Sequence, residues 1–197
     1  MNEILVLYYS KSGSVKEMAS LIGRGINSVD GAQAKIRTVP EIFPDIKKQT
    51  ASIPDSGSLY VTLDDLKNCS GLALGSPTRF GNMAAPLKYF IETATPLWLN
   101  GSLENKPACV FTSSSSLHGG NEATLLSMQI PLFHMGMVLL GLPYSLPELA
   151  TTTSGGTPYG ASHVGTHKNI QSISDDEKRL CIAQGVRLGE ISLKLSR

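Results

Sequence analysis

Residues 4–9 are all apolar or aromatic and form an uninterrupted run near the start of the chain. A strand that is apolar on both faces is typical of a parallel sheet covered by helices on each side. The run is followed by a serine-rich turn and then by apolar residues that recur at helical spacing from Val15 to Ile26. This strand–turn–helix unit predicts an α/β fold built on a parallel sheet.

Strands and helices continue to alternate along the rest of the chain. Further strands are predicted over residues 34–39, 72–74, 108–112 and 138–142. Helices are predicted to begin near Thr62, Pro86, Asn121 and Ser174, the first and last with capping boxes. Polar and apolar residues alternate within 34–39, which indicates an edge strand with one wet face. Five strands with the second at the edge predict a flavodoxin-like, doubly wound sheet in the order 2-1-3-4-5 with helices on both faces. We expect one domain over residues 1–197.

The predicted helices and the longest connections have features of their own. The helix over residues 121–135 contains Pro131, which is expected to strain or kink it. Residues 40–61 and 143–173 show no clear periodicity, and segments of this length are usually lids, oligomer contacts or disordered. The final helix has a face rich in small residues, expected to let it lie close to the sheet: Cys181, Ile182, Gly185, Val186, Gly189 and Ser192.

Composition and charge argue against several classes of function. The formal net charge is +1 and no stretch concentrates lysine and arginine, so nucleic-acid binding is not expected. No apolar run approaches the roughly 18–20 residues of a membrane span, and no secretion signal precedes the first strand, so we expect a cytoplasmic protein. The three cysteines are far apart and lack CxxC spacing, which disfavours disulfides and zinc ribbons. His163 and His167 have HxxxH spacing, but they lie in a turn-rich segment, so no metal site is predicted.

Three polar loops follow predicted strands, at residues 10–15, 76–82 and 113–119. In an open parallel sheet, ligands bind beyond the carboxyl ends of the strands, where the strand order reverses. We therefore expect these three loops to meet and to form the functional site.

The first loop has the composition of a phosphate site. Hydroxyl side chains at Ser10, Ser12 and Ser14 flank the flexible Gly13, and a helix begins directly afterwards. Backbone N–H groups and the positive end of a helix dipole bind anions at such a turn, although an ordinary polar turn with a serine cap has the same composition. The loop contains neither GxGxxG nor GxxxxGK[ST], which disfavours dinucleotide and triphosphate cradles. Neither this loop nor residues 75–76 carries the acidic groups that a response-regulator receiver needs.

The second and third loops offer a different set of groups. Residues 76–83 combine a proline, a hydroxyl, a guanidinium, an aromatic ring and a glycine, which suits a heteroaromatic ligand. The alternative is a surface turn in which Arg79 pairs with a carboxylate. Residues 113–120 supply many small donors directly after a buried strand, a position that makes a plain linker a weak interpretation.

Four blocks of sequence resemble the WrbA group, which are flavodoxin-like NAD(P)H:quinone oxidoreductases. The blocks cover the chain nearly end to end, at residues 6–10, 75–83, 97–98 and 155–161. PTRFGNM at residues 77–83 and GGTPYGA at residues 155–161 are more specific than the first loop. The resemblance implies an enzyme that binds FMN and reduces quinones by two electrons, through hydride transfer from NADH or NADPH.

The resemblance also implies roles for individual residues. The implied FMN-binding residues are Ser10, Lys11, Ser12, Gly13, Ser14, Val15, Pro77, Thr78, Arg79, Phe80, Gly81, Ser113, Ser114, Ser115, Ser116, Leu117, His118 and His134. Ser12, Phe80 and Trp98 are implied to contact the substrates. His134 is implied to be catalytic, and we hypothesise that it donates a hydrogen bond or a proton to the reduced quinone.

The WrbA group forms tetramers in which neighbouring subunits complete each site. The resemblance therefore implies a homotetramer, with contacts expected from residues 143–173. Ser12 is smaller than the residue that many relatives carry there, which leaves the choice between NADH and NADPH open.

Two other functions are compatible with parts of the sequence. A one-electron flavodoxin carrier shares the fold and the cofactor, but such carriers are commonly very acidic whereas this chain is nearly neutral. A non-enzymatic accessory to a transcriptional repressor is the second alternative, and no basic surface pattern supports it.

Overall fold

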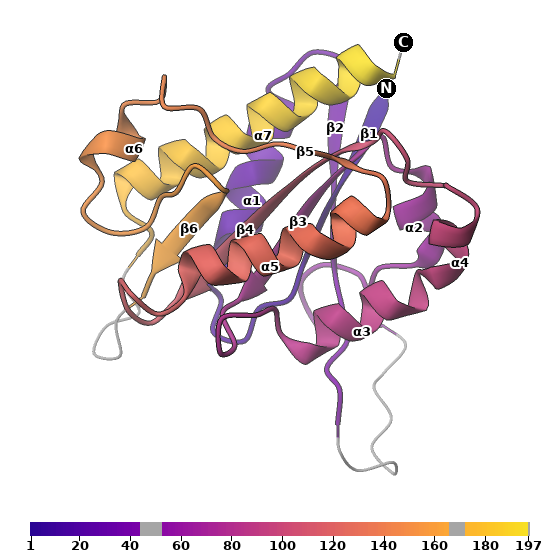
Figure 1. Cartoon of the computed structure of the whole chain (residues 1–197), viewed down its shortest axis with the longest axis horizontal. Helices are drawn as coiled ribbons and strands as arrows, with labels where there is room; N and C mark the ends of the chain where they lie inside the picture. The colour runs from indigo at the N-terminus through magenta and orange to yellow at the C-terminus, as the bar shows by residue number, and fades with distance from the viewer. Residues whose placement is uncertain (44–52, 166–171, 197) are drawn as a thin grey trace.

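The computed structural model describes residues 1–43, 53–165 and 172–196, which form a sheet between two layers of helices (Figure 1). The strands are β1 Asn2–Tyr8, β2 Ala32–Thr38, β3 Gly71–Pro77, β4 Pro107–Ser114, β5 Val138–Leu139 and β6 Ala161–Val164. The helices are α1 Ser14–Asn27, α2 Leu63–Asn68, α3 Ala85–Thr93, α4 Thr95–Leu99, α5 Asn121–His134, α6 Glu148–Thr151 and α7 Asp175–Leu195.

The strand order β2-β1-β3-β4-β5 confirms the predicted topology, and the strands pair in parallel. β1 and β3 lie in the middle of this order and are largely buried, as their apolar sequences predict. Among the described strands β2 pairs with β1 alone, its far side meets only an isolated bridge from Thr38 to Tyr60, and all its residues but Ala32 keep some exposure. The alternating sequence of β2 therefore predicted its position at the edge correctly.

The sequence predicted one strand over residues 138–142 beside β4, but two short strands pair with β4 instead. β5 is only two residues long and pairs with Pro107 and Ala108 at the start of β4. β6 pairs with residues 111–114 at the end of β4, where the sequence indicated an aperiodic connection. Two short strands thus share the edge of β4 and are separated by residues 140–160. Each is too short to show a period, which explains why the sequence did not indicate the division.

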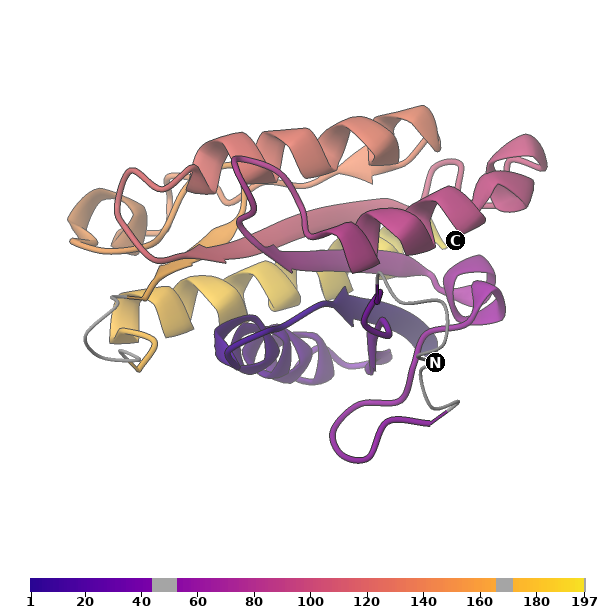
Figure 2. The same ribbon diagram turned by 90° about the horizontal axis from the view of Figure 1, so that it is seen from below.

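The side chains of the central strands alternate between two apolar layers. Leu5 and Leu7 of β1 pack in the layer that includes residues of α3 and α5, and Ile4 and Val6 pack in the layer that includes α1 and α7. Figure 2 shows α3 and α5 on one face of the sheet and α1 and α7 on the other. Both faces of the sheet are therefore covered, which confirms the doubly wound arrangement.

Several helices begin or end where the sequence predicted. Thr62 and Asp65 form a capping box at α2, and Ser174 and Glu177 form one at α7. α5 contains Pro131 and continues as far as His134, close to the predicted end. The short helices α4 and α6 were not predicted.

The small residues of α7 pack chiefly against α1 rather than against the sheet. A Cβ on Gly189 would lie 3.1 Å from the side chain of Val29, in the turn after α1. Ser192 has the predicted role, because its hydroxyl lies 2.4 Å from the Cβ position of Gly71 in β3. The helix–helix contact dominates because α1 and α7 cover the same face of the sheet.

The three cysteines are all buried and unpaired. Burial raises the pKa of the Cys69 thiol to about 11 and that of Cys109 to about 12. These thiols are therefore protonated and unreactive at neutral pH. Among the described residues, no helix is both long enough and apolar enough to cross a membrane.

Candidate functional site

The three polar loops predicted to form the site meet at the lower edge of the sheet in Figure 1. They follow the carboxyl ends of β1, β3 and β4, which are neighbours in the sheet. Their polar backbone groups lie at the surface, while the strands that carry them are almost fully buried. The sheet thus holds three polar loops along one edge, each carried by a buried strand.

The first loop leads directly into α1 and leaves that helix uncapped. Gly13 is the N-cap residue in a left-handed conformation with φ of 100°, and no side chain of the described residues caps the first turn. The Ser10 hydroxyl accepts a hydrogen bond of 3.1 Å from the Gly13 N–H and so fixes the turn. A Cβ on Gly13 would meet no atom within 4 Å, so the glycine is explained by its backbone angle. The open N-terminus of α1 can therefore bind an anion.

The second loop is tied to its neighbours through a chain of hydroxyl groups. The Ser76 hydroxyl accepts the Ala84 N–H at 2.8 Å, and the Thr112 hydroxyl of β4 donates to the Ser76 carbonyl at 2.7 Å. The Thr124 hydroxyl of α5 donates to the Thr78 hydroxyl at 3.2 Å. These bonds join the loop to β4 and α5. These hydrogen bonds therefore fix the position of residues 76–84 relative to β4 and α5.

Phe80 stands at the tip of a tight turn. Arg79 and Asn82 exchange backbone hydrogen bonds of 2.8 and 3.0 Å, and the two residues between them have positive φ, 52° at Phe80 and 77° at Gly81. This is the pattern of a two-residue type I′ turn, in which glycine and asparagine are favoured and phenylalanine is strained. Phe80 is also fully exposed, at 106% of the reference area of the residue. A strained, exposed aromatic ring indicates a binding role rather than a packing role.

The third loop lies beside the second and beside β6. The Thr78 N–H donates to the Ser113 carbonyl at 2.8 Å, and the Gly165 N–H donates to the Ser114 carbonyl at 2.8 Å. The Ser114 hydroxyl bonds to the Ser116 carbonyl at 2.7 Å and folds the loop back on itself. Beyond this point, residues 115–118 are exposed.

These loops enclose a polar cavity of about 510 Å³, called here the first cavity. Its lining residues are Lys11, Ser12, Ser14, Pro77, Thr78, Arg79, Phe80, Ser113, Ser114, Ser115, Gly119 and Gly165. The volume lies within the range of small-molecule and cofactor sites. All three predicted loops thus contribute to one cavity. Gly119 belongs to the predicted third loop but was not named as a binding residue, and Gly165 was not predicted. Seven named residues lie in or next to the loops without lining the cavity: Ser10, Gly13, Val15, Gly81, Ser116, Leu117 and His118.

An ion pair lies at the rim of the first cavity. The Lys11 ammonium lies 2.8 Å from Oε1 of Glu41, and the Tyr9 hydroxyl donates to the same oxygen at 3.4 Å. The hydrogen bond that Lys11 donates to Glu41 raises the pKa of Lys11, while burial and the nearby Glu41 carboxylate raise the pKa of Tyr9. Both groups are therefore protonated at neutral pH. The charge of Lys11 is shared with Glu41.

His134 and Trp98 lie elsewhere. They line a second cavity of about 490 Å³ between α3, α4 and α5, together with Ile91, Ile130 and Met135 among others. Within the described chain, the two cavities have no lining residue in common. A single chain therefore does not bring His134 and Trp98 into the cavity formed by the three loops.

Residues 3–150 match the family described as NADPH-dependent FMN reductase. The chain belongs to this family. It is 39% identical over 207 residues to an NAD(P)H dehydrogenase (quinone) from Syntrophobacter fumaroxidans, with 99% of each chain covered. It is also 39% identical over 198 residues to a protein of the same name from Acidithiobacillus ferrooxidans, again with 99% of each covered. The resemblance predicted from the sequence blocks is thus confirmed at the level of the family.

Solved structures support the fold. A WrbA-like flavodoxin from Agrobacterium tumefaciens superposes with a TM-score of 0.68 at 16% identity, over 98% of this chain and 99% of that one. An archaeal flavodoxin superposes with a TM-score of 0.63 at 21% identity, over 99% of both chains. At these identities the likeness establishes the flavodoxin-like fold of this family member.

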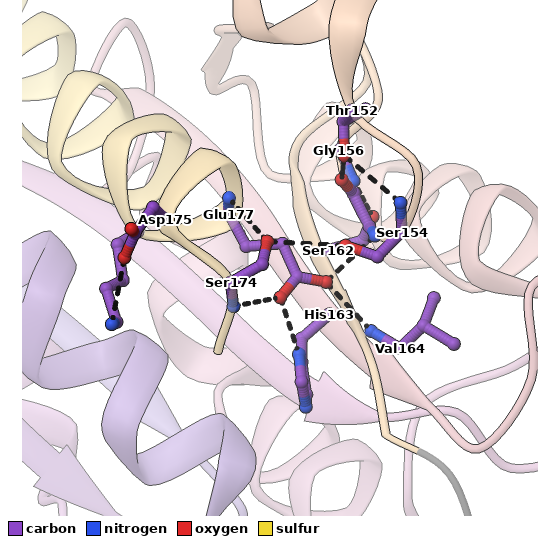
Figure 3. Close-up of polar contacts among 11 residues, drawn as sticks. Thr152, Ser154, Gly156, Ser162, His163, Val164, Ser174, Asp175 and Glu177 are labelled. Atoms are coloured by element: carbon purple, nitrogen blue, oxygen red, sulfur yellow. Dashed lines mark hydrogen bonds and ion pairs between the residues drawn. The ribbon is translucent and has the colours of Figure 1, made fainter. Parts of the chain in front are cut away.

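A buried polar cluster lies between β6 and the start of α7 (Figure 3). Glu177, in the first turn of α7, accepts backbone hydrogen bonds from Gly155 at 2.8 Å, Val164 at 3.1 Å and Ser174 at 2.8 Å. His163 of β6 places Nδ1 2.9 Å from Oε2 of Glu177. Both side chains are about 1% exposed. The cluster joins β6, the GGTPYGA block and the start of α7.

The charge state of Glu177 follows from its partners. Burial alone raises the pKa of a carboxyl group, but the bonds from His163, Ser174 and Gly155 outweigh burial and lower the pKa of Glu177 to about 2. The sequence indicated Glu177 only as a capping residue and His163 only as half of an HxxxH pair. His163 bonds to Glu177, and His167 lies outside the described residues. No sequence period connects the two elements, so their pairing was not predicted.

Proposed function

We propose that this protein is an FMN-dependent NAD(P)H:quinone oxidoreductase. The observation that carries the proposal is the first cavity, where three loops join an uncapped helix N-terminus to an exposed aromatic ring. The names of the full-length relatives, NAD(P)H dehydrogenase (quinone), support the same reaction. When bound, FMN supplies two-electron chemistry, taking a hydride from the nicotinamide nucleotide and passing electrons to the quinone.

The residues of the first cavity fit such a cofactor. We place the phosphate at the N-terminus of α1, where the backbone N–H groups of residues 12–15 and the helix dipole favour an anion. The left-handed Gly13 has open space in front of it, so its backbone can be approached closely. The hydroxyls and backbone of residues 113–115 are placed to hydrogen-bond the polar edge of a flavin ring.

Phe80 and Arg79 are placed to contact the planar rings of the substrates. The exposed ring of Phe80 offers one face for stacking, which orients a planar ring without fixing its identity. The Arg79 guanidinium donates to the carbonyl of Thr78 at 2.9 Å and so stays beside the turn at the cavity wall. This arrangement suits successive binding of nicotinamide and quinone at one place.

We infer that a second copy of the chain completes the site. His134 and Trp98, which the resemblance assigns to catalysis and substrate binding, line the second cavity, which has no lining residue in common with the first. The helices that form this cavity carry exposed apolar side chains, whose exposed fractions range from 44 to 64%: Tyr89 on α3, Trp98 on α4, and Leu126, Ile130 and Phe133 on α5. Apolar patches of this kind are typical of interfaces between subunits. The proposal therefore includes assembly as a homotetramer. We also propose that the protein is cytoplasmic.

The test of the activity is anaerobic stopped-flow on the FMN-loaded protein. NADH and NADPH are each expected to bleach the flavin absorbance, and benzoquinone is expected to restore it. Absence of bleaching with both nucleotides would refute the oxidoreductase while leaving the fold intact. A stable blue semiquinone on titration with dithionite would instead favour a one-electron carrier.

A further inference from the structure

A third cavity, of about 520 Å³, shares lining residues with each of the other two. It has Arg79 in common with the first cavity, and Asn82, Met83 and Lys88 in common with the second. Its other lining residues are Tyr9, Ala84, Ala85 and Pro86. The three cavities therefore adjoin one another around the turn of residues 79–82. A ligand that stacks on Phe80 in the first cavity can extend past Arg79 into the third.

The side chains that line the third cavity include two cations and no carboxylate. One cation is Arg79, whose guanidinium is exposed and donates to the carbonyl of Thr78 at 2.9 Å. Within the described ranges, Arg79 forms no ion pair with a carboxylate. The alternative of a surface turn in which Arg79 pairs with an acidic side chain is therefore not observed there. A guanidinium has five N–H donors, so most of them are left for an anion.

The other cation is Lys88, near the start of α3. Its ammonium lies 2.5 Å from Oε1 of Glu92, one turn further along the helix, and both side chains are at least half exposed. An exposed ion pair of this spacing contributes only about 0.3–0.5 kcal/mol, so Lys88 is free to turn toward a stronger anion. The dipole of α3 also favours an anion near this end of the helix, which has no side-chain cap.

The chemistry of the proposed hydride donor matches this arrangement. A nicotinamide nucleotide has a neutral reduced ring, then one ribose, and then a pyrophosphate with two negative charges. If the ring stacks on Phe80, the pyrophosphate lies one sugar away, and the neighbouring residue Arg79 leads into the third cavity. The planar fork of arginine suits two phosphate oxygens at once, and lysine adds a point charge. Quinones have no such group.

We propose that the third cavity binds the pyrophosphate of the nicotinamide nucleotide, through the guanidinium of Arg79 and the ammonium of Lys88. The inference rests on the proposed function, since it requires the hydride donor to stack at the first cavity. NADH and NADPH share the pyrophosphate, so the cavity contributes equally to the binding of both. The sequence interpretation implied that Arg79 binds FMN and gave Lys88 no role.

Two substitutions on α3 change the charge at the third cavity in opposite directions. Lys88→Gln removes a cation and leaves the Glu92 carboxylate, whereas Glu92→Gln removes the competing carboxylate and leaves Lys88 available. Both side chains are exposed, so neither change is expected to unfold the protein. Lys178→Gln is the matched control, because Lys178 also forms an exposed ion pair within a helix, with Asp175, and lines none of the three cavities. A pair that only stabilised α3 would not give opposite effects.

The experiment compares donors with and without the pyrophosphate on FMN-loaded protein. The rate of flavin reduction against donor concentration gives apparent dissociation constants for NADH, NADPH and reduced nicotinamide riboside, which has no phosphate. Lys88→Gln is expected to weaken NADH and NADPH about tenfold, the size of a charge-assisted hydrogen bond. Glu92→Gln is expected to strengthen both about twofold. The riboside is expected to respond to neither variant, and Lys178→Gln to change no donor.

Calorimetric titration with ADP, and with adenosine as the uncharged control, measures the same site without turnover. ADP is expected to follow NADH through the variants, and adenosine to follow none of them. A loss confined to NADPH would place the 2′-phosphate at Lys88 and overturn the assignment of the pyrophosphate. Equal losses for the riboside, or unchanged binding of every donor and of ADP, would overturn the site while the proposed function stands. If neither nucleotide reduces the flavin of the unsubstituted protein, the proposed function fails and the inference fails with it.

Discussion

The carbonyl oxygen of Ile22 lies 2.1 Å from the position that a Cβ on Gly185 would occupy. α1 and α7 therefore touch backbone to backbone, and Gly25 makes the reciprocal approach, 2.2 Å from the carbonyl oxygen of Ile182. No side chain at position 185 fits unless one helix moves. Since α1 also presents its N-terminus to the first cavity, the packing of these helices determines where that end lies.

Gly185→Ala is expected to destabilise the protein by about 1–3 kcal/mol, because overpacking against backbone outweighs the gain in helix propensity. Urea unfolding followed by circular dichroism measures the effect. Gly189→Ala is the matched control, since its Cβ would lie 3.1 Å from the side chain of Val29 rather than against backbone, and a smaller loss of stability is expected. Equal stability of the Gly185→Ala variant and the unsubstituted protein would show that the helices are not packed this closely.

Glu177 is expected to make stability depend on pH in the acid range. Its folded pKa of about 2 lies below the ordinary value of 4.5, so the ionised form is bound preferentially by the native state. The contribution is fully present above pH 4.5 and is lost as the pH falls toward 2. It amounts to about 3 kcal/mol, from 1.36 kcal/mol per pKa unit.

The free energy of unfolding, measured between pH 3 and 7, checks this expectation. Glu177→Gln should lower stability at pH 7 and flatten the decline below pH 4.5. Glu122→Gln, an exposed carboxylate in the first turn of α5, is the control and should leave the slope unchanged. A Glu177→Gln variant with the same acid slope as the unsubstituted protein would contradict the shifted pKa.

Much of the fold was predictable because its signals are local. The apolar run at residues 4–9, the capping boxes at Thr62 and Ser174 and the edge pattern of 34–39 each reflect a few consecutive residues. The division of the fifth strand position was not predictable, since the pairing of β6 depends on β4, some fifty residues earlier in the chain.

The candidate site was also predictable only in part. The loops of the first cavity follow strand ends, so a topological rule placed them together. The separation of His134 from that cavity depends on how α5 packs, and the pairing of His163 with Glu177 depends on the approach of β6 to α7. Neither relationship leaves a pattern in the sequence. Their positions had to come from the three-dimensional arrangement.

The positive φ of Phe80 is expected to lower the stability of the fold, while its ring is expected to contribute to substrate binding. Phe80→Asn places a residue that tolerates positive φ at the tip of the turn and should stabilise the protein by up to about 1 kcal/mol. Phe80→Ala removes the same ring but keeps the unfavourable φ, which makes it the matched control. Both variants are expected to raise the KM for benzoquinone about tenfold, because the stacking face is lost. Melting temperatures and steady-state kinetics test the two effects separately, and unchanged kinetics in both variants would exclude Phe80 from substrate binding.

The apolar face around the second cavity gives the test of assembly. Ile130 is 60% exposed on α5, beside His134 and Trp98 in the lining of the second cavity. Ile130→Glu would bury a charge in the proposed interface, so light scattering should report a smaller particle than for the unsubstituted protein. Turnover should fall at the same time, since His134 and Trp98 no longer reach a neighbouring first cavity. FMN binding should fall less than turnover does, because the cradle at α1 belongs to a single chain and only His134 of the implied FMN-binding residues would come from the second copy.

Leu195→Glu is the control for this substitution. Leu195 is 48% exposed near the end of α7, away from the second cavity, and its replacement should change neither particle size nor turnover. If Ile130→Glu dissociates the assembly and full turnover remains, the site is complete within one chain and the roles assigned to His134 and Trp98 are wrong. If the unsubstituted protein is already monomeric and active, the second copy is unnecessary. Loss of both size and turnover in Ile130→Glu alone is the expected result, because the apolar face and the two residues belong to the same surface.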